Sequence, residues 1–321
     1  MRGVARFLGL AAALLLASGA TAQTYPDKSV RVVVGFTAGG PTDVIARFVS
    51  QKLSESLGQQ FYVENVPGAG SNIASGIVAK APPDGYTLLV ISTGFLVNPS
   101  LYAKVPYDAV KDFAPITLVA ASPNVISVNP EVPAKTIQEL IALIKANPGK
   151  YSYAGPGTGS TPHLSAEQFR IQFGLDLPHV PFGGAAPAVT AVIAGHVPIV
   201  FSALPPAISA IKGGQLRALA VTATTRVAAL PDVPTMAEAG VPDQEADTLT
   251  GILAPAGTPP AIIAKLNSEI KRAVEGADVR DKLTVLGFVP VLNTPDEFAV
   301  RIEKEMTKWG KVVHDANIKI E

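Results

Sequence analysis

The 321-residue chain contains no cysteine, which excludes disulfide bonds, a thiolate metal site and a lipid anchor attached to a cysteine. Charged residues make up only 16% of the chain, and 26 basic side chains balance 26 acidic ones. A neutral chain of this kind lacks the basic surface typical of nucleic-acid binding. The 48% hydrophobic content instead predicts a globular protein with a large core.

Sequence signatures of cofactor and metal sites are also missing. No phosphate-binding loop occurs, and Gly35, Gly39 and Gly40 have the wrong spacing for a dinucleotide fingerprint, although Glu64 near the end of the second predicted strand resembles its acidic partner. The four histidines, at 163, 179, 196 and 314, show no metal-ligand spacing. We therefore expect neither a metal nor an organic cofactor.

Evidence for catalysis is equally sparse. The chain has no G-x-S-x-G elbow of the serine hydrolases. In "GPGTGSTPH" Ser160 precedes His163 by three residues at a predicted helix start, which is the spacing of a helix cap. We expect a protein that is not an enzyme.

The N-terminus has the pattern of an export signal. Arg2 and Arg6 precede a short apolar run over residues 7–16, and Ala20-Thr21-Ala22 offers a cleavage site. The run is too short for a comfortable membrane span, which disfavours an uncleaved anchor. We predict a signal peptide over residues 1–22 and a periplasmic mature protein.

Strands and helices alternate along the mature chain, which predicts an α/β fold. Buried strands are expected at 30–36, 60–65 and 86–92, and two more at 113–121 and 124–129. The pattern restarts with a helix over 136–146, which Thr136 and Glu139 open as a capping box. The block after residue 245 is too short to form its own domain.

These blocks predict two lobes joined by two crossings, near 122–125 and within the proline-rich segment 229–244. Residues 23–123 together with 246–321 are assigned to lobe 1, and residues 124–245 to lobe 2. A cleft between two such lobes is a favoured place for a ligand.

Four strand-to-helix loops are rich in glycine and hydroxyl residues, at 36–43, 92–94, 157–161 and 182–184. Such loops gather at the carboxyl ends of the strands, where helix N-termini carry about half a positive charge each. Each loop alone is also a good turn and cap. Several together predict a carboxylate site that needs no arginine.

Six stretches in order carry a resemblance to a known family: "GFTAGGPTD", "ENVPGAGSNIASGIVAKAPPDGYTLL", "GPGTGSTPHLSAEQF", "HVPFGGAAPAVTAVIAGHV", "LRALAVTATTRVAALPDVPTMAEAGV" and "ILAPAGTPPAIIAKLN". The mature chain resembles the substrate receptors of tripartite tricarboxylate transporters, also called Bug-type receptors. The resemblance implies a type II-like, two-lobed periplasmic binding protein of the Venus flytrap kind. It would close on a small carboxylate (a di- or tricarboxylate, an amino acid or an aromatic acid), and a monomer is expected to deliver it to a membrane permease.

The resemblance also implies the ligand-binding residues. It places the first grip at Thr37, Ala38, Gly39, Gly40 and Asp43. It places the second grip at Gly157, Thr158, Gly159, Ser160, Thr161 and His163. The implied walls of the site are Phe36, Ser92, Thr93, Asn98, Phe182, Gly183 and Ser202.

Two departures from the family pattern bear on the pocket. Gly35 stands where proline is common, which predicts a more flexible approach to the first loop. Leu249 and Thr250 stand where an aromatic residue is common, which predicts a more open cleft if that position lines it. Two alternatives to transport stay open, a secreted α/β hydrolase and a ligand sensor that feeds a signalling kinase. The loops of the two grips contain no arginine or lysine, so the sequence does not indicate which carboxylate is bound.

Overall fold

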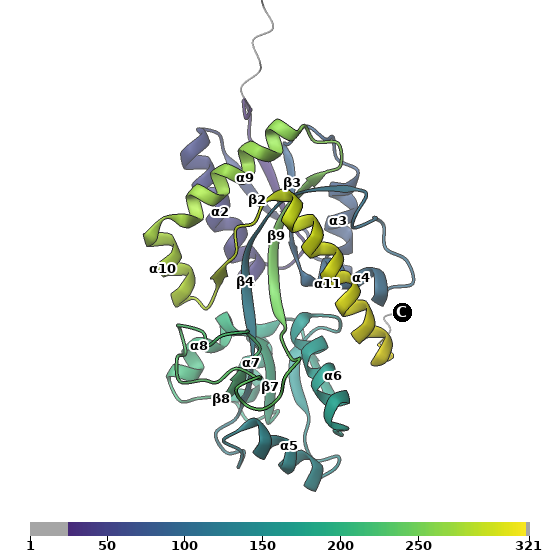
Figure 1. Cartoon of the computed structure of the whole chain (residues 1–321), viewed down its shortest axis with the longest axis vertical. Coiled ribbons are helices and arrows are strands. Elements are labelled where there is room, and N and C mark those ends of the chain that lie inside the picture. Colours follow the sequence, from purple (N-terminus) through teal and green to yellow (C-terminus); the bar gives the residue numbers. More distant parts are fainter. Residues whose placement is uncertain (1–24, 319–321) are drawn as a thin grey trace, which may run out of the picture.

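The computed structural model describes residues 25–318, and the predicted signal peptide lies outside this range. Figure 1 shows an elongated molecule with two lobes, one above the other. The strands form one sheet in the order β2-β1-β3-β9-β4-β7-β5-β6, with β8 and β10 each pairing with β4. None of the helices in residues 25–318 has the length and apolarity to cross a membrane.

Lobe 1 is a three-layer α/β unit. Its strands are β1 (Val30–Val34), β2 (Phe61–Asn65), β3 (Thr87–Ser92), β9 (Asp247–Pro255), β10 (Val289–Pro290) and the first part of β4 (Phe113–Val128). Its helices are α2 (Pro41–Leu57), α3 (Asn72–Ala79), α4 (Thr93–Leu101), α9 (Pro260–Glu275), α10 (Ala277–Val285) and α11 (Pro295–Asp315), with a short 3₁₀ turn at Ala69–Ser71.

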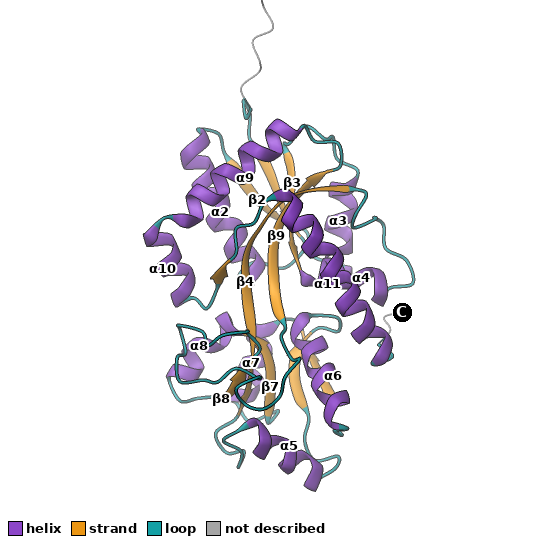
Figure 2. Ribbon diagram, viewed as in Figure 1, coloured by secondary structure: helices purple, strands orange, loops and turns teal. Residues whose placement is uncertain are grey.

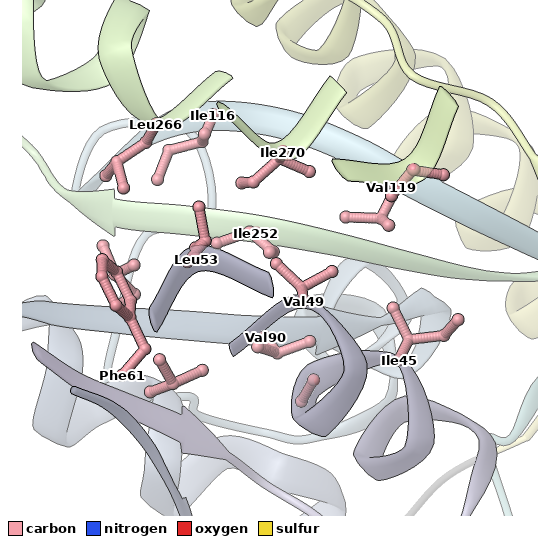
Figure 3. Close-up of a cluster of buried hydrophobic side chains, with 14 of the residues drawn as sticks. Ile45, Val49, Leu53, Phe61, Val90, Ile116, Val119, Ile252, Leu266 and Ile270 are labelled. Atoms are coloured by element: carbon pink, nitrogen blue, oxygen red, sulfur yellow. The ribbon is translucent and has the colours of Figure 1, made fainter. Parts of the chain in front are cut away.

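Both faces of the lobe 1 sheet are covered, as the unbroken apolar run of β1 predicts. Val32 and Val34 pack on one face with α2 and α9, and Val33 packs on the other with α3 and α4. Figure 3 shows the first of these cores, in which Ile45 and Val49 of α2 approach the sheet. The helical spacing of these two residues therefore turns one stripe of α2 inward.

Lobe 2 repeats the three-layer arrangement. Its strands are β5 (Tyr153–Pro156), β6 (His179–Phe182), β7 (Ile199–Ala203), β8 (Arg217–Val221) and the end of β4. Helices α5 (Ile137–Ala146) and α6 (Thr161–Phe173) cover one face, and α7 (Ala185–Ile193) and α8 (Leu204–Lys212) cover the other. At the start of α5, Thr136 caps the helix, but Glu139 accepts from the N–H of Lys135, so the predicted capping box is incomplete.

The two lobes share strand β4, which runs without a break from one to the other (Figure 2). The sequence predicts two strands here, at 113–121 and 124–129. The prediction is wrong, since Pro123 stays in register with Asp247 of β9. Thr222, just after β8, joins the two crossings: its hydroxyl donates to the carbonyl of Ala246 at 2.6 Å and accepts from the N–H of Asn124 at 2.9 Å.

The second crossing lies later in the chain than the segment 229–244. That segment packs on lobe 2, where Leu230 and Met236 are buried. The chain passes to lobe 1 at Ala246 and Asp247. The two crossings are thus neighbouring strands rather than separate loops, and they pair at the middle of the molecule.

Candidate functional site

A cleft of about 350 Å³ lies between the lobes, at the carboxyl ends of β1, β3, β5, β6 and β7. It contains most of the residues that the sequence singles out: Phe36, Thr37, Gly40, Ser92, Asn98, Gly157, Thr158, Gly159, Ser160, Thr161, Phe182 and Gly183. Both lobes contribute, and each lining loop leads directly into a helix.

Five helices begin at this cleft. Their N-cap residues are Gly40 for α2, Ser92 for α4, Ser160 for α6, Gly184 for α7 and Ala203 for α8, and all five line it. The first N–H groups of a helix have no intrahelical partner and carry partial positive charge. No charged side chain lines the cleft within residues 25–318. The site therefore suits an anion that is held by backbone groups and hydroxyls.

In the first loop, Asp43 organises the backbone instead of facing the cleft. Its carboxylate is 2% exposed and accepts hydrogen bonds from the N–H of Gly39 at 2.9 Å, from Arg47 Nε at 2.9 Å and from Asn65 Nδ2 at 2.8 Å. Burial raises the pKa of Asp43, but these hydrogen bonds outweigh it and lower the pKa below its usual value. Gly39 has φ +85°, so a side chain would be strained there.

The second loop uses His163 in the same way. Its Nδ1 atom accepts from the N–H of Gly159 at 3.2 Å, and Ser160 Oγ caps α6 by accepting from the backbone N–H of His163. Burial, followed by the nearby rings and charges of His179 and Arg170, lowers the pKa of His163 to about 3, so the ring is neutral. Ser160 and His163 thus form a helix cap, as their spacing predicts. Nδ1 of His163 accepts from Gly159 and does not activate the Ser160 hydroxyl.

Six predicted residues do not line the cleft: Ala38, Gly39, Asp43, Thr93, His163 and Ser202. Besides the loop-forming residues already described, Thr93 joins α4 to β9, donating to Asp247 O and accepting from Leu249 N. Ser202 is fully buried and donates to the carbonyl of Ala203. These polar side chains support the walls from behind.

Four further lining residues, Pro41, Thr42, Gly94 and Gly184, lie within the predicted loops but were not assigned individually to the ligand site. The lining residues that sequence reasoning missed are Gly70, Tyr102, Pro156, Pro162, Ala185, Ala203 and Thr248. Most are immediate neighbours of predicted residues, and a wider window would have included them. Tyr102 follows α4, and Gly70 lies in the 3₁₀ turn; Asn98 links the turn to α4 by donating to Gly70 O at 2.7 Å. Thr248 sits inside a strand, where no local signal marks it.

Both departures from the family pattern have a different meaning in the structure. Gly35 is buried against the turn, because a Cβ atom there would lie 1.8 Å from Ser71 Oγ. Close packing, not flexibility, therefore requires glycine at this position. Leu249 is 2% exposed and packs in the core with Phe298, so it does not open the cleft.

Comparison with known proteins agrees with this geometry. The sequence model described as "Tripartite tricarboxylate transporter family receptor" matches residues 45–318. The chain belongs to this receptor family. Protein BugT of Bordetella pertussis is 36% identical over 307 residues, which cover 95% of this chain and 94% of BugT. The family predicted from the six sequence stretches is confirmed.

Solved structures of the family share the fold. R. palustris Rpa4515 with adipate is 35% identical, with a TM-score of 0.87 over 92% of this chain and 100% of that one. MatC from Rhodopseudomonas palustris with bound malate is also 35% identical, with a TM-score of 0.82 over 90% and 100%. The predicted two-lobed periplasmic-binding-protein fold is confirmed, and the chain is a solute-binding receptor of the Bug type.

Proposed function

We propose that this receptor captures a small carboxylate in the cleft by closing its lobes and delivers it to the membrane permease of a tripartite tricarboxylate transporter. The observation that carries the proposal is the convergence of five helix N-termini on a cleft lined by no charged side chain among residues 25–318. Related receptors hold adipate and malate, which are both dicarboxylates.

In this proposal, hydroxyls and unpaired helix N–H groups from both lobes hold the ligand. Thr37 and Gly40 approach it from lobe 1, and Thr158, Ser160 and Gly183 approach it from lobe 2. Charge-assisted hydrogen bonds of this kind are about twice as strong as neutral ones. Because both lobes contribute donors, binding favours the closed arrangement over the open one.

Lobe closure would turn the molecule about the paired crossings at Pro123 and Asp247. We assign residues 23–123 and 246–321 to one moving body and residues 124–245 to the other. The remaining parts of the proposal follow from the family and the N-terminal pattern: a cleaved export signal, a periplasmic monomer, and binding without catalysis or a cofactor.

The test is calorimetric titration of the exported chain with adipate, malate and a panel of other carboxylates, beside a thermal-shift screen. A true ligand at about 100 times its dissociation constant adds about 2.7 kcal/mol to the free energy of unfolding. Small-angle scattering then shows a smaller radius of gyration in the complex. Absence of binding across the panel, or cleavage of chromogenic esters by the cleft, contradicts the proposal.

A further inference from the structure

A second cavity, of about 370 Å³, lies on the other face of the hinge strands. Successive side chains of β9 point to opposite faces, so they line different cavities. Thr248 lines the cleft, whereas Asp247 and Leu249 line the second cavity. We call this cavity the hinge-side pocket. Its volume falls within the range of about 300–1,000 Å³ that is typical of small-molecule sites.

Both lobes wall the hinge-side pocket. The loop after β8, residues 223–228, comes from lobe 2, and residues 288–291 with Arg301 come from lobe 1. Figure 1 shows the same closeness of the lobes where α10 lies above α8. Any molecule that touches both walls therefore ties the lobes together on the side opposite the cleft.

The pocket holds one carboxylate that has no hydrogen-bond partner among residues 25–318. No residue in 25–318 donates a hydrogen bond to the Asp247 side chain, and its Oδ1 atom is fully buried. A buried acceptor in this state is costly unless a donor reaches it. Burial raises the pKa of Asp247 to about 6; Glu305 and Glu245 add to the rise, whereas Arg301 and Lys308 oppose it.

Two guanidinium groups stand at the rim, one from each lobe. Arg226 holds Glu238 through Nε, and Arg301 holds Glu305 through Nη2 at 2.8 Å. Both side chains are 46% exposed, and each keeps N–H groups that no residue in 25–318 accepts. Arginine N–H groups are the preferred donors to a carboxylate.

Apolar side chains complete the lining, among them Leu118, Val227, Leu249 and Phe288. The pocket thus offers an acceptor for a cation, donors for a carboxylate and an apolar wall. These are the complements of the three parts of an α-amino acid with an apolar side chain.

We propose that the hinge-side pocket binds an apolar α-amino acid, whose ammonium pairs with Asp247 and whose carboxylate is held by Arg301 and Arg226. An occupant that bridges the lobes resists the rotation that narrows the cleft, so it weakens binding of the carboxylate in the cleft. This second statement rests on the proposed function, because it needs lobe closure. Coupling of this kind is reciprocal between the two ligands.

The test compares three probes by calorimetry on the exported chain: L-leucine, 4-methylpentanoate, which lacks the ammonium, and 3-methylbutylamine, which lacks the carboxylate. Leucine should bind about tenfold or more tightly than either analogue. Asp247→Asn should make leucine bind no more tightly than 4-methylpentanoate. Arg301→Gln should make leucine bind no more tightly than 3-methylbutylamine. Lys304→Gln, an exposed change on the same helix that does not touch the pocket, should leave all three affinities unchanged.

Leucine also carries a carboxylate, so binding in the cleft must be distinguished from binding in the hinge-side pocket. Gly40→Val makes this distinction, because Gly40 lines the cleft and not the hinge-side pocket. Leucine binding that survives Gly40→Val and falls in Asp247→Asn supports the hinge-side pocket. No leucine binding, the reverse pattern, or equal binding by both folded variants overturns it. Saturating leucine should also weaken adipate binding about threefold or more. Failure of adipate to bind at all would count against the proposed function while leaving the leucine comparison intact.

Discussion

Gly159 donates its backbone N–H to the ring of His163, whose Nδ1 atom lies 3.2 Å away. In the other lobe Gly39 donates in the same way to the carboxylate of Asp43, at 2.9 Å. Both glycines have positive φ, and both acceptors lie in the first turn of the helix that follows. Each lobe thus fixes its grip loop by one buried side chain, which leaves the neighbouring N–H groups free to meet a ligand.

Gly39 and Gly40 should respond differently to the same substitution. Gly40 has ordinary φ of −76° and lines the cleft, so Gly40→Val should weaken adipate binding about tenfold or more, about 1.4 kcal/mol, with little change in melting temperature. Gly39→Val should instead cost about 1–2 kcal/mol of unfolding free energy, because φ is +85°. Calorimetric titration beside a melting curve measures both, and the reverse pattern would show that Gly40 does not approach the ligand.

Acid should destabilise the protein through His163. The unfolded histidine takes up a proton below its ordinary pKa, whereas the folded ring stays neutral down to about 3, so unfolding gains protons as the pH falls between these values. The free energy of unfolding should fall by up to about 1.4 kcal/mol per pH unit in that window. His163→Asn keeps an acceptor for Gly159 and should flatten this dependence; an unchanged slope in denaturant titrations would contradict the assignment.

Asp247 should act in the opposite direction. Its folded pKa, raised to about 6 by burial, exceeds its ordinary value of 3.8, so the folded state binds the proton first and stability is lost as the pH rises through this interval. Asp247→Asn should therefore stabilise the protein near neutral pH, by at most about 3 kcal/mol. In the variant, the free energy of unfolding should also fall more steeply as the pH falls, because protonation of Asp247 no longer stabilises the folded state. Equal melting temperatures of variant and parent at high and low pH would refute this.

The contact between Gly287 and α8 should influence lobe closure. A Cβ atom on Gly287 would lie 2.6 Å from Ile208 Cδ1 of the other lobe, so Gly287→Ala should push the lobes apart beside the hinge-side pocket. The rotation that relieves this narrows the cleft, so we expect a smaller radius of gyration without ligand and about threefold tighter adipate binding. Gly257→Ala is the matched control, because Gly257 also has positive φ but would meet only Pro83, at 3.8 Å. Equal scattering curves for both variants would show that the added Cβ atom at position 287 does not push the lobes apart.

Local sequence signals predicted the elements well, because each one follows from periodicity and caps. The helix predicted over 136–146 is α5, at 137–146, and the strand predicted over 86–92 is β3, at 87–92. The join between β4 and the second lobe escaped prediction. Proline often ends a strand. At Pro123 the strand continues because this residue pairs with Asp247, which is more than a hundred residues away in the sequence.

The candidate site divides along the same line. Loops with glycine and hydroxyl residues were predicted because their composition is local. The sequence could not separate residues that face the cleft from those that support it, because Ala203 and Ser202 differ only in which way their strand turns them. Tyr102 and Thr248 reach the cleft through tertiary packing, for which a single sequence has no signal.

A cleft whose positive potential comes from helix ends alone acts over a short distance, since such partial charges are matched by opposite ones at the far end of each helix. Formal charges would steer anions from about a Debye length away, roughly 8 Å at physiological salt. The receptor should therefore collect its ligand by unguided diffusion. Its association rate should change little with ionic strength, and discrimination between acids should reside in how slowly each one leaves.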